Sequence, residues 1–165
     1  MRVLIVCTGN ICRSPTAEAL LRHHLKEAGL DARVLVDSAG TENWNAGCRP
    51  TPLAVEMAKA RGYDMGGLIA RQIEEGDFSR FDLMLALDRG HVRILERLRP
   101  PDSKSAIALF MTYGKVEPDE VPDPYFGGPD EYGYALDLIE SAVPGVVARI
   151  RSHLEAGASS AFAEG

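Results

Sequence analysis

The sequence predicts an α/β fold in which a central four-stranded parallel sheet is covered by helices on both faces. Short apolar runs alternate along the chain with segments of helical period, and no repeat, linker or change of composition divides them. The 165 residues, 45% hydrophobic and 25% charged, also suffice for one packed core. We therefore expect a single-domain three-layer sandwich over residues 1–156, followed by a frayed, flexible tail over 157–165.

The expected strands are short apolar runs, three of which are rich in β-branched or bulky aliphatic residues. The first contains the uninterrupted run Val3-Leu4-Ile5-Val6, which is typical of a strand buried on both faces. The four runs cover residues 2–7, Val34–Asp37, Leu83–Leu87 and Ala106–Phe110.

Helical segments lie between and after these runs. In the first, apolar residues recur at i, i+3, i+4, i+8 and i+11, which predicts a helix that begins at Pro15 and ends at Gly29. Further helices are expected over 51–61, 88–98 and about 131–155. Because Pro144 lies inside the last helix and lacks an N–H group, we expect a kink or a break there.

The segment between the first strand and the first helix reads Cys7-Thr8-Gly9-Asn10-Ile11-Cys12-Arg13-Ser14. This Cys-x5-Arg loop can surround one tetrahedral oxyanion with backbone N–H groups, next to the positive end of a helix. Gly9 and Asn10 are expected to supply positive φ angles, and Ser14 to cap the helix before Pro15. Such a site favours the nucleophilic thiolate form of a cysteine. A Cys-x5-Arg match alone is common, and an ordinary buried cysteine is the alternative, but the strand-loop-helix context favours an anion site.

The stretch Val6–Pro15 resembles the signature of the low-molecular-weight protein tyrosine phosphatases. Four later segments resemble that family in the same order: Asp37–Thr41, Trp44-Asn45, Ala70–Gln72 and Val121–Tyr125. The resemblance covers residues 2 to about 155. It implies hydrolysis of phosphate monoesters without a metal or any other cofactor.

The resemblance also implies a role for each motif residue. Cys7 would attack phosphorus, Arg13 would bind two oxygens of the phosphoryl group, and Asp123 would act first as general acid and then as base. On composition alone, Asp123 reads as a turn aspartate. The substrate-binding residues would be Thr8, Gly9, Asn10, Ile11, Cys12, Ser14, Trp44 and Tyr125.

Other residues near the loop would support it. Ser38 and Asp88 match family positions that brace the loop by hydrogen bonds, although each could instead be a turn residue or a helix cap. Leu68 departs from the family, because some members carry a histidine of the bracing network there. Cys12 could capture an oxidised Cys7 as a disulfide, or it could be a small packing residue.

Ile11 favours phosphotyrosine as the substrate. Bacterial protein arginine phosphatases of the same superfamily share Thr8 but carry threonine at the position of Ile11, and an apolar side chain there suits the flank of an aromatic ring. Trp44 and Tyr125 would stack on that ring at the entrance. The expected partner is a phosphotyrosine-containing protein or peptide, or a small aryl phosphate. A phosphoarginine protein is the alternative.

Two functions of other classes stay open. Arsenate reductases of this fold relay a disulfide through two further cysteines, whereas only Cys48 follows Cys12 in this chain. A non-catalytic phosphoprotein-binding module would need neither a thiolate nor a proton donor. The joint presence of Cys7, Arg13 and Asp123 therefore argues against a module of that kind.

Charge and composition argue against several kinds of partner and site. The net charge of -6 speaks against nucleic acid and against an anionic membrane surface. No stretch is apolar enough to span a bilayer, no signal peptide is evident, and an odd number of cysteines fits a reducing cytoplasm. The histidines at 23, 24, 91 and 153 have no ligand spacing, so they are expected at the surface or its boundary, and no metal site is expected. Asp119 and Glu120 read as solvated loop charges.

Overall fold

The structure, a computed structural model, describes residues 1–163 and contains the expected four-stranded sheet, with all strands parallel. The strands lie in the order β2-β1-β3-β4, so the first strand is central. Their bounds are Arg2–Cys7 for β1, Leu35–Gly40 for β2, Leu83–Ala86 for β3 and Ala106–Leu109 for β4. The predicted sheet is confirmed. Only β2 differs clearly from expectation, because Ser38 to Gly40 continue the pairing with Ile5 to Cys7.

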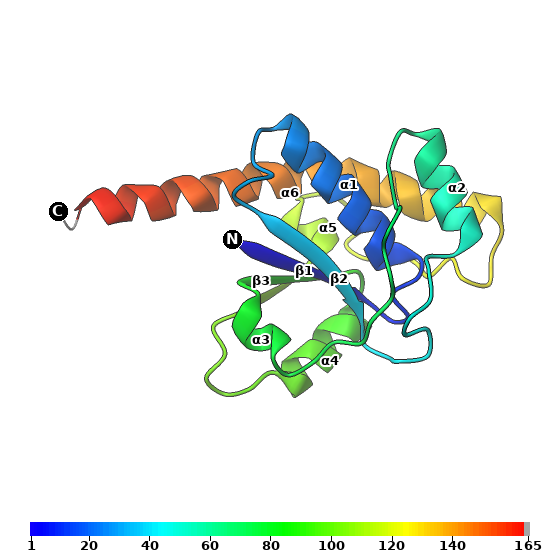
Figure 1. The fold of residues 1–165 in the computed structure, drawn as a ribbon, viewed down its shortest axis with the longest axis horizontal. Coiled ribbons are helices and arrows are strands. Elements are labelled where there is room, and N and C mark those ends of the chain that lie inside the picture. Colours follow the sequence, from blue (N-terminus) through cyan, green and yellow to red (C-terminus); the bar gives the residue numbers. More distant parts are fainter. Residues whose placement is uncertain (164–165) are drawn as a thin grey trace.

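Helices cover both faces of this sheet (Figure 1). The long ones are α1 (Arg13–Glu27), α2 (Pro52–Ala60), α4 (Arg89–Leu98) and α6 (Pro129–Ala163). Two helices of four residues each, α3 (Asp77–Arg80) and α5 (Phe110–Tyr113), were not predicted, since so short a segment shows no helical period.

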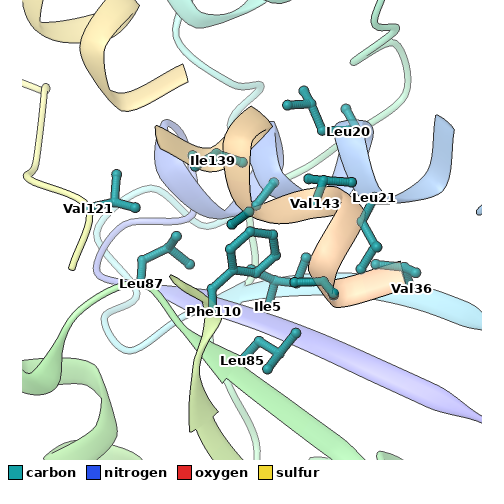
Figure 2. Close-up of a cluster of buried hydrophobic side chains, with 14 of the residues drawn as sticks. Ile5, Leu20, Leu21, Val36, Leu85, Leu87, Phe110, Val121, Ile139 and Val143 are labelled. Carbon is teal, nitrogen blue, oxygen red and sulfur yellow. The ribbon is translucent and has the colours of Figure 1, made fainter. Parts of the chain in front are cut away.

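The alternating side chains of the strands divide the hydrophobic core into two layers. Val3 and Ile5 of β1 face α1, α2, α5 and α6, whereas Leu4 and Val6 face α3 and α4. Figure 2 shows the larger layer, in which Phe110 lies between the sheet and the helices above it. Each fully buried aliphatic or aromatic side chain contributes about 1.5–3 kcal/mol to folding, so this layer fixes α1, and with it the loop that precedes α1, against β1.

Helix α1 begins earlier than predicted. It starts at Arg13, with Cys12 in the N-cap position and no side-chain hydrogen bond to the cap. The prediction that Ser14 is the N-cap is therefore wrong. The physical reason is that the Ser14 hydroxyl lies inside the first turn, 2.9 Å from Cys7 Sγ, where it serves the loop and not the helix end.

Helix α6 is longer than predicted at both ends and is not broken at Pro144. Its apolar residues pack against the sheet and α1 on both sides of the proline, and this packing outweighs the lost backbone hydrogen bond. The helix continues to Ala163, into the segment expected to be a frayed tail, while residues 164–165 lie outside the described part of the chain.

The contact between α6 and the end of α5 leaves no room for a side chain. A Cβ atom added at Gly145 would overlap the carbonyl group of Gly114. We expect Gly145→Ala to lower the free energy of unfolding by about 1–3 kcal/mol or more, because the backbone itself would have to move. Urea denaturation measures this effect. Gly157→Ala, in the same helix, is the matched control: a Cβ there meets no atom within 4 Å, and stability should be unchanged or slightly raised. Equal stability of the two variants would contradict the prediction.

Candidate active site

The Cys-x5-Arg loop joins the carboxyl end of β1 to the first residue of α1, as predicted. Asn10 has a φ of 57°, which confirms the left-handed conformation expected for it. Gly9 does not have a positive φ, so that part of the prediction is wrong. A Cβ at Gly9 would come within 2.6 Å of the side-chain amide nitrogen of Asn45, so a larger residue there would displace the Asn45 side chain.

The carbonyl groups of the loop are bound by the segments around it. The carbonyl oxygens of Cys7 and Thr8 accept from the N–H groups of Thr41 and Glu42, at 2.8 and 3.0 Å. The Ile11 carbonyl accepts from the Thr51 N–H at 2.9 Å. The N–H and C=O of a trans peptide unit point in opposite directions, so this arrangement turns the N–H groups toward the centre of the loop. A ring of such donors next to a helix N-terminus can hold one tetrahedral oxyanion.

Buried hydrogen bonds hold Cys7 at the base of this ring. The Cys7 Sγ atom lies 2.9 Å from Ser14 Oγ and accepts from the Asn10 N–H at 3.3 Å. The Asn10 amide donates to Ser14 Oγ at 2.8 Å and to Ser38 Oγ at 2.9 Å, while its oxygen accepts from the Arg71 N–H at 3.0 Å. The Asn10 side chain thus connects the loop to α1, to β2 and to the segment before α3.

This bracing network contains a carboxylate that sequence reasoning missed. Ser38 Oγ donates to Glu18, a buried residue of α1 whose other oxygen pairs with Arg22. Burial raises the pKa of Glu18. The available signal was spacing, since Glu18 lies one helical turn after Ser14 on the same face. Leu68, the departure from the family pattern, packs against the larger core layer, and the Asn10 amide is bonded without a histidine there.

Arg13 is the buried cation of the site, with only 3% of its side chain exposed. Its Nη1 donates to Asp88 Oδ2 at 2.8 Å and to the Val121 carbonyl at 2.9 Å. The pKa of Asp88 is affected by burial, which alone would raise it, but His91 and the Arg13 guanidinium outweigh burial and lower it. The guanidinium is therefore fixed by an ionised partner at the start of α4.

His91 is a correction to the sequence analysis, because it is buried in the site and not at the surface. Its Nδ1 lies 3.2 Å from Asp88 Oδ1 and its Nε2 lies 2.9 Å from Thr8 Oγ1. Burial lowers its pKa to about 4, so the ring is neutral at pH 7. Within the described residues, the ring makes its hydrogen bond through Nε2 and the Thr8 hydroxyl, whereas the buried Nδ1 makes none. The signal that could have revealed it was its position three residues after the helix-capping Asp88.

Asp123 lines the same cavity as the loop residues Cys7 and Arg13. Its Oδ2 is 3.5 Å from Arg13 Nη2, its Oδ1 accepts from the Tyr125 N–H at 3.1 Å, and half of its side chain is exposed. The cavity has a volume of about 230 Å³. Of the predicted site residues, all but Asn10 and Ser14 line it, and Asn45 and Phe126 line it in addition. Asn10 and Ser14 are buried behind the loop.

Aromatic side chains form the rim of this cavity. Trp44 is 72% exposed and Phe126 is 96% exposed, and the rings of Tyr125 and Phe126 meet edge to face at 4.9 Å between their centroids. Such exposure of large apolar rings is unusual on a protein surface and indicates a surface that contacts another molecule. Ile11 adds an apolar wall at the same entrance.

Cys12 lines the same cavity, and its sulfur contacts the hydroxyl groups of two residues outside the loop. Its Sγ lies 3.2 Å from Tyr132 Oη and 3.6 Å from Thr51 Oγ1. Burial raises the pKa of Cys12, so its neutral thiol is favoured, and burial likewise raises the pKa of Tyr132 to about 12. All three cysteines have free thiols. The alternative that Cys12 forms a disulfide with Cys7 on oxidation stays a prediction.

A larger hollow of about 1140 Å³ lies at the amino ends of the strands, where Asp82, Ser105 and Arg149 line it. We place the site in the smaller cavity because Cys7, Arg13 and Asp123 converge there, at the carboxyl ends of the strands. Among the residues that the structure describes, no three His, Cys, Asp or Glu side chains group as a metal site. Within the same part of the chain, each helix is too short or too polar to cross a bilayer.

Comparison with known proteins assigns the family. The model of the family described as low molecular weight phosphotyrosine protein phosphatase matches residues 2–156. The chain belongs to this family. It is 41% identical over 162 residues to the low molecular weight protein-tyrosine-phosphatase of Streptomyces coelicolor, an alignment that covers 96% of this chain and 98% of the relative.

Solved structures of low molecular weight phosphatases share the fold. A protein tyrosine phosphatase from Entamoeba histolytica superposes with a TM-score of 0.88 at 31% identity, covering 93% of this chain and 98% of its own. A Drosophila arginine phosphatase superposes with a TM-score of 0.83 at 32% identity, covering 93% and 98%. Both similarities support the predicted fold. Because one of these structures is a tyrosine phosphatase and the other an arginine phosphatase, the similarity in fold does not distinguish the two substrates.

The low pKa of His91 makes stability depend on pH. The unfolded chain takes up a proton at His91 near pH 6.5, whereas the folded protein does so only near pH 4. Between these values the unfolded state binds more protons, so the free energy of unfolding falls as the pH falls, by up to ~3 kcal/mol from this residue. Above pH 6.5, this contribution of His91 to the free energy of unfolding is fully present.

Urea denaturation at a series of pH values from 7 to 4 measures this dependence. We expect His91→Gln to flatten the fall in stability over that range, whereas His153→Gln, at an exposed position of α6, should follow the wild type. Parallel curves for His91→Gln and the wild type would show that the buried ring is not responsible.

Proposed function

We propose that this protein is a phosphotyrosine-protein phosphatase that uses Cys7 as nucleophile and Asp123 as general acid and base. The observation that carries the proposal is the convergence of three groups in one cavity: the Cys7 sulfur, the buried Arg13 guanidinium and the Asp123 carboxylate. Membership of the phosphatase family supports it. The chemistry needs no metal, because the charge of the transferring group is met by Arg13 and the loop N–H groups.

In the first step, the Cys7 thiolate attacks phosphorus in line with the leaving oxygen, and the bond from phosphorus to that oxygen breaks. The Ser14 hydroxyl lies 2.9 Å from the sulfur and the Asn10 N–H donates to it at 3.3 Å, and these two contacts hold the sulfur at the base of the loop. Arg13 Nη1 is occupied by Asp88 and Val121, so the Nε–Nη2 edge is the one that binds two phosphoryl oxygens. Asp123 gives its proton to the departing oxygen.

In the second step, water attacks the cysteinyl-phosphate, and the bond between phosphorus and sulfur breaks. Asp123, now ionised, takes a proton from that water. Inorganic phosphate leaves and the Cys7 thiolate is restored. Asp123 is half exposed at the cavity mouth, where both the leaving group and the attacking water can reach it.

The rim supports an aromatic substrate. Trp44 and Tyr125 stand on the walls and can stack on a phosphorylated ring, while Ile11 contacts its flank. We propose a phosphotyrosine-containing protein or peptide, or a small aryl phosphate, as the substrate. Similarity to an arginine phosphatase keeps phosphoarginine as the second candidate. In that case the first step breaks the bond from phosphorus to a guanidinium nitrogen instead of the bond to an oxygen, and the second step is the same. We also propose a reducing compartment such as the cytoplasm, since the nucleophile must be a free thiol.

Release of inorganic phosphate from matched phosphotyrosine and phosphoarginine peptides tests this proposal. We expect fast release from phosphotyrosine without added metal, a loss of all turnover in Cys7→Ser, and a loss of about 10²–10⁴-fold in Asp123→Asn. Preference for phosphoarginine would keep the mechanism and replace the substrate. Absence of phosphate release from either peptide would refute the proposal that the protein is a phosphatase. Binding of a phosphopeptide without release of phosphate would indicate a phosphoprotein-binding module. Arsenate-dependent oxidation of thiols would indicate a reductase.

Replacement of Arg13 by lysine tests the planar fork separately from the charge. Arg13→Lys keeps a cation but cannot bind two oxygens while holding Asp88 and the Val121 carbonyl, so kcat should fall by about 10²–10³-fold. The measurement is steady-state hydrolysis of an aryl phosphate, with the urea midpoint as a control for folding. Turnover close to that of the wild type would remove this role from Arg13.

A further inference from the structure

We propose that Arg89 is a positioning residue for the general acid: it fastens the segment that carries Asp123 to the first turn of α4. The inference rests on the proposed function of Asp123. It concerns a residue that the motifs do not include and that makes no contact with the substrate cavity.

The contacts of Arg89 are directed at two consecutive acidic residues. Its Nη1 donates to Asp119 Oδ1 and to Glu120 Oε1, at 3.1 Å each, and its Nη2 donates to Asp119 Oδ2. Its backbone N–H also donates to Glu120 Oε2 at 2.8 Å. Asp119 and Glu120 are therefore not the solvated loop charges that the sequence indicated. They bind one arginine, and Glu120 also binds an N–H group at the N-terminus of α4.

The attachment continues along the segment toward Asp123. Directly after Glu120, the Val121 N–H donates to the Leu87 carbonyl at 2.9 Å, and the Val121 carbonyl accepts from Arg13 at 2.9 Å. Pro122 and Pro124 flank Asp123, and each proline ring fixes its own φ. A stiff segment anchored at 119–121 leaves the Asp123 carboxylate little freedom, so the anchor determines where the carboxylate points.

The same turn of α4 also holds the phosphate-binding arginine. Asp88 binds Arg13, and Arg89 binds the acid segment, so two neighbouring residues fix both partners of the reacting group relative to each other. Arg89 is 53% exposed, and exposed ion pairs contribute little to global stability. Its effect should therefore appear in the placement of Asp123 and not in the stability of the fold.

The test compares two esters that differ in their need for an acid. Phenyl phosphate releases a strongly basic phenolate that must be protonated, whereas 4-nitrophenyl phosphate releases a weak base that leaves with little help. We expect Arg89→Ala to lower kcat/KM for phenyl phosphate about tenfold and for 4-nitrophenyl phosphate less than about threefold. In an Asp123→Asn background, the same substitution should change neither value, because the group it positions is already absent.

Two further variants serve as controls. Asp119→Asn combined with Glu120→Gln removes the same ion pairs from the loop side and should reproduce the Arg89→Ala pattern. Because the two variants change different segments, a folding defect in one of them still leaves the other to test the proposal. Arg97→Ala, at an exposed position of the same helix, should behave as the wild type with both esters.

Equal losses on the two esters, or a loss that adds to that of Asp123→Asn, would overturn the role of Arg89. So would wild-type kinetics in Arg89→Ala. Those outcomes leave the proposed function standing as long as Cys7→Ser is inactive on both esters. Activity in Cys7→Ser would instead refute the proposed function itself.

Discussion

The buried guanidinium of Arg13 lies where three distant segments of the chain meet. It belongs to the first residue of α1, its Nη1 is bound by Asp88 from the start of α4, and the same nitrogen is bound by Val121 from the loop before α6. A charge withdrawn from water is tolerated only when it is paired and hydrogen-bonded, so the three segments cannot separate without leaving an unpaired ion. This requirement couples the Cys-x5-Arg loop to the segment that carries Asp123, the proposed general acid.

The strand order makes this meeting possible. β1 is central, with β2 and β3 as its neighbours, and the helices that follow β1 and β3 lie on opposite faces of the sheet (Figure 1). The chain therefore diverges at the carboxyl ends of β1 and β3, which leaves a crevice between the two connections. The Cys-x5-Arg loop leaves from one side of that crevice and Asp88 from the other. The candidate active site therefore lies in a crevice at the carboxyl ends of the strands, outside the two layers of the hydrophobic core.

Local patterns in the sequence predicted the elements whose signals are local. The apolar run before Cys7, the helical period after Pro15 and the left-handed Asn10 each follow from neighbouring residues, and the structure confirms them. What could not be predicted depends on partners far along the chain. Ser14 reads as a helix cap until the Cys7 sulfur lies beside it, and His91 reads as a surface residue until Thr8 approaches its ring. Asp119 and Glu120 look solvated because Arg89, thirty residues earlier, gives no local sign of its partner. The fold of α6 beyond Pro144 likewise depends on tertiary packing that propensity does not contain.

The outward direction of the loop carbonyls has a consequence for molecular recognition. A loop that presents only N–H donors would bind the phosphoryl group through its oxygens. Those oxygens are present in the ester, in the proposed covalent intermediate and in the free phosphate that leaves. Such a loop can stabilise the reacting group but distinguishes poorly between anions of the same shape. Under the proposed function, selectivity would then come from the apolar entrance lined by Ile11, Trp44 and Tyr125, which would contact the organic part of the ester and lose that contact once it departs. The organic group would thus decide which ester is retained, and the enzyme would bind the intermediate and the product phosphate without the contacts that the organic group made.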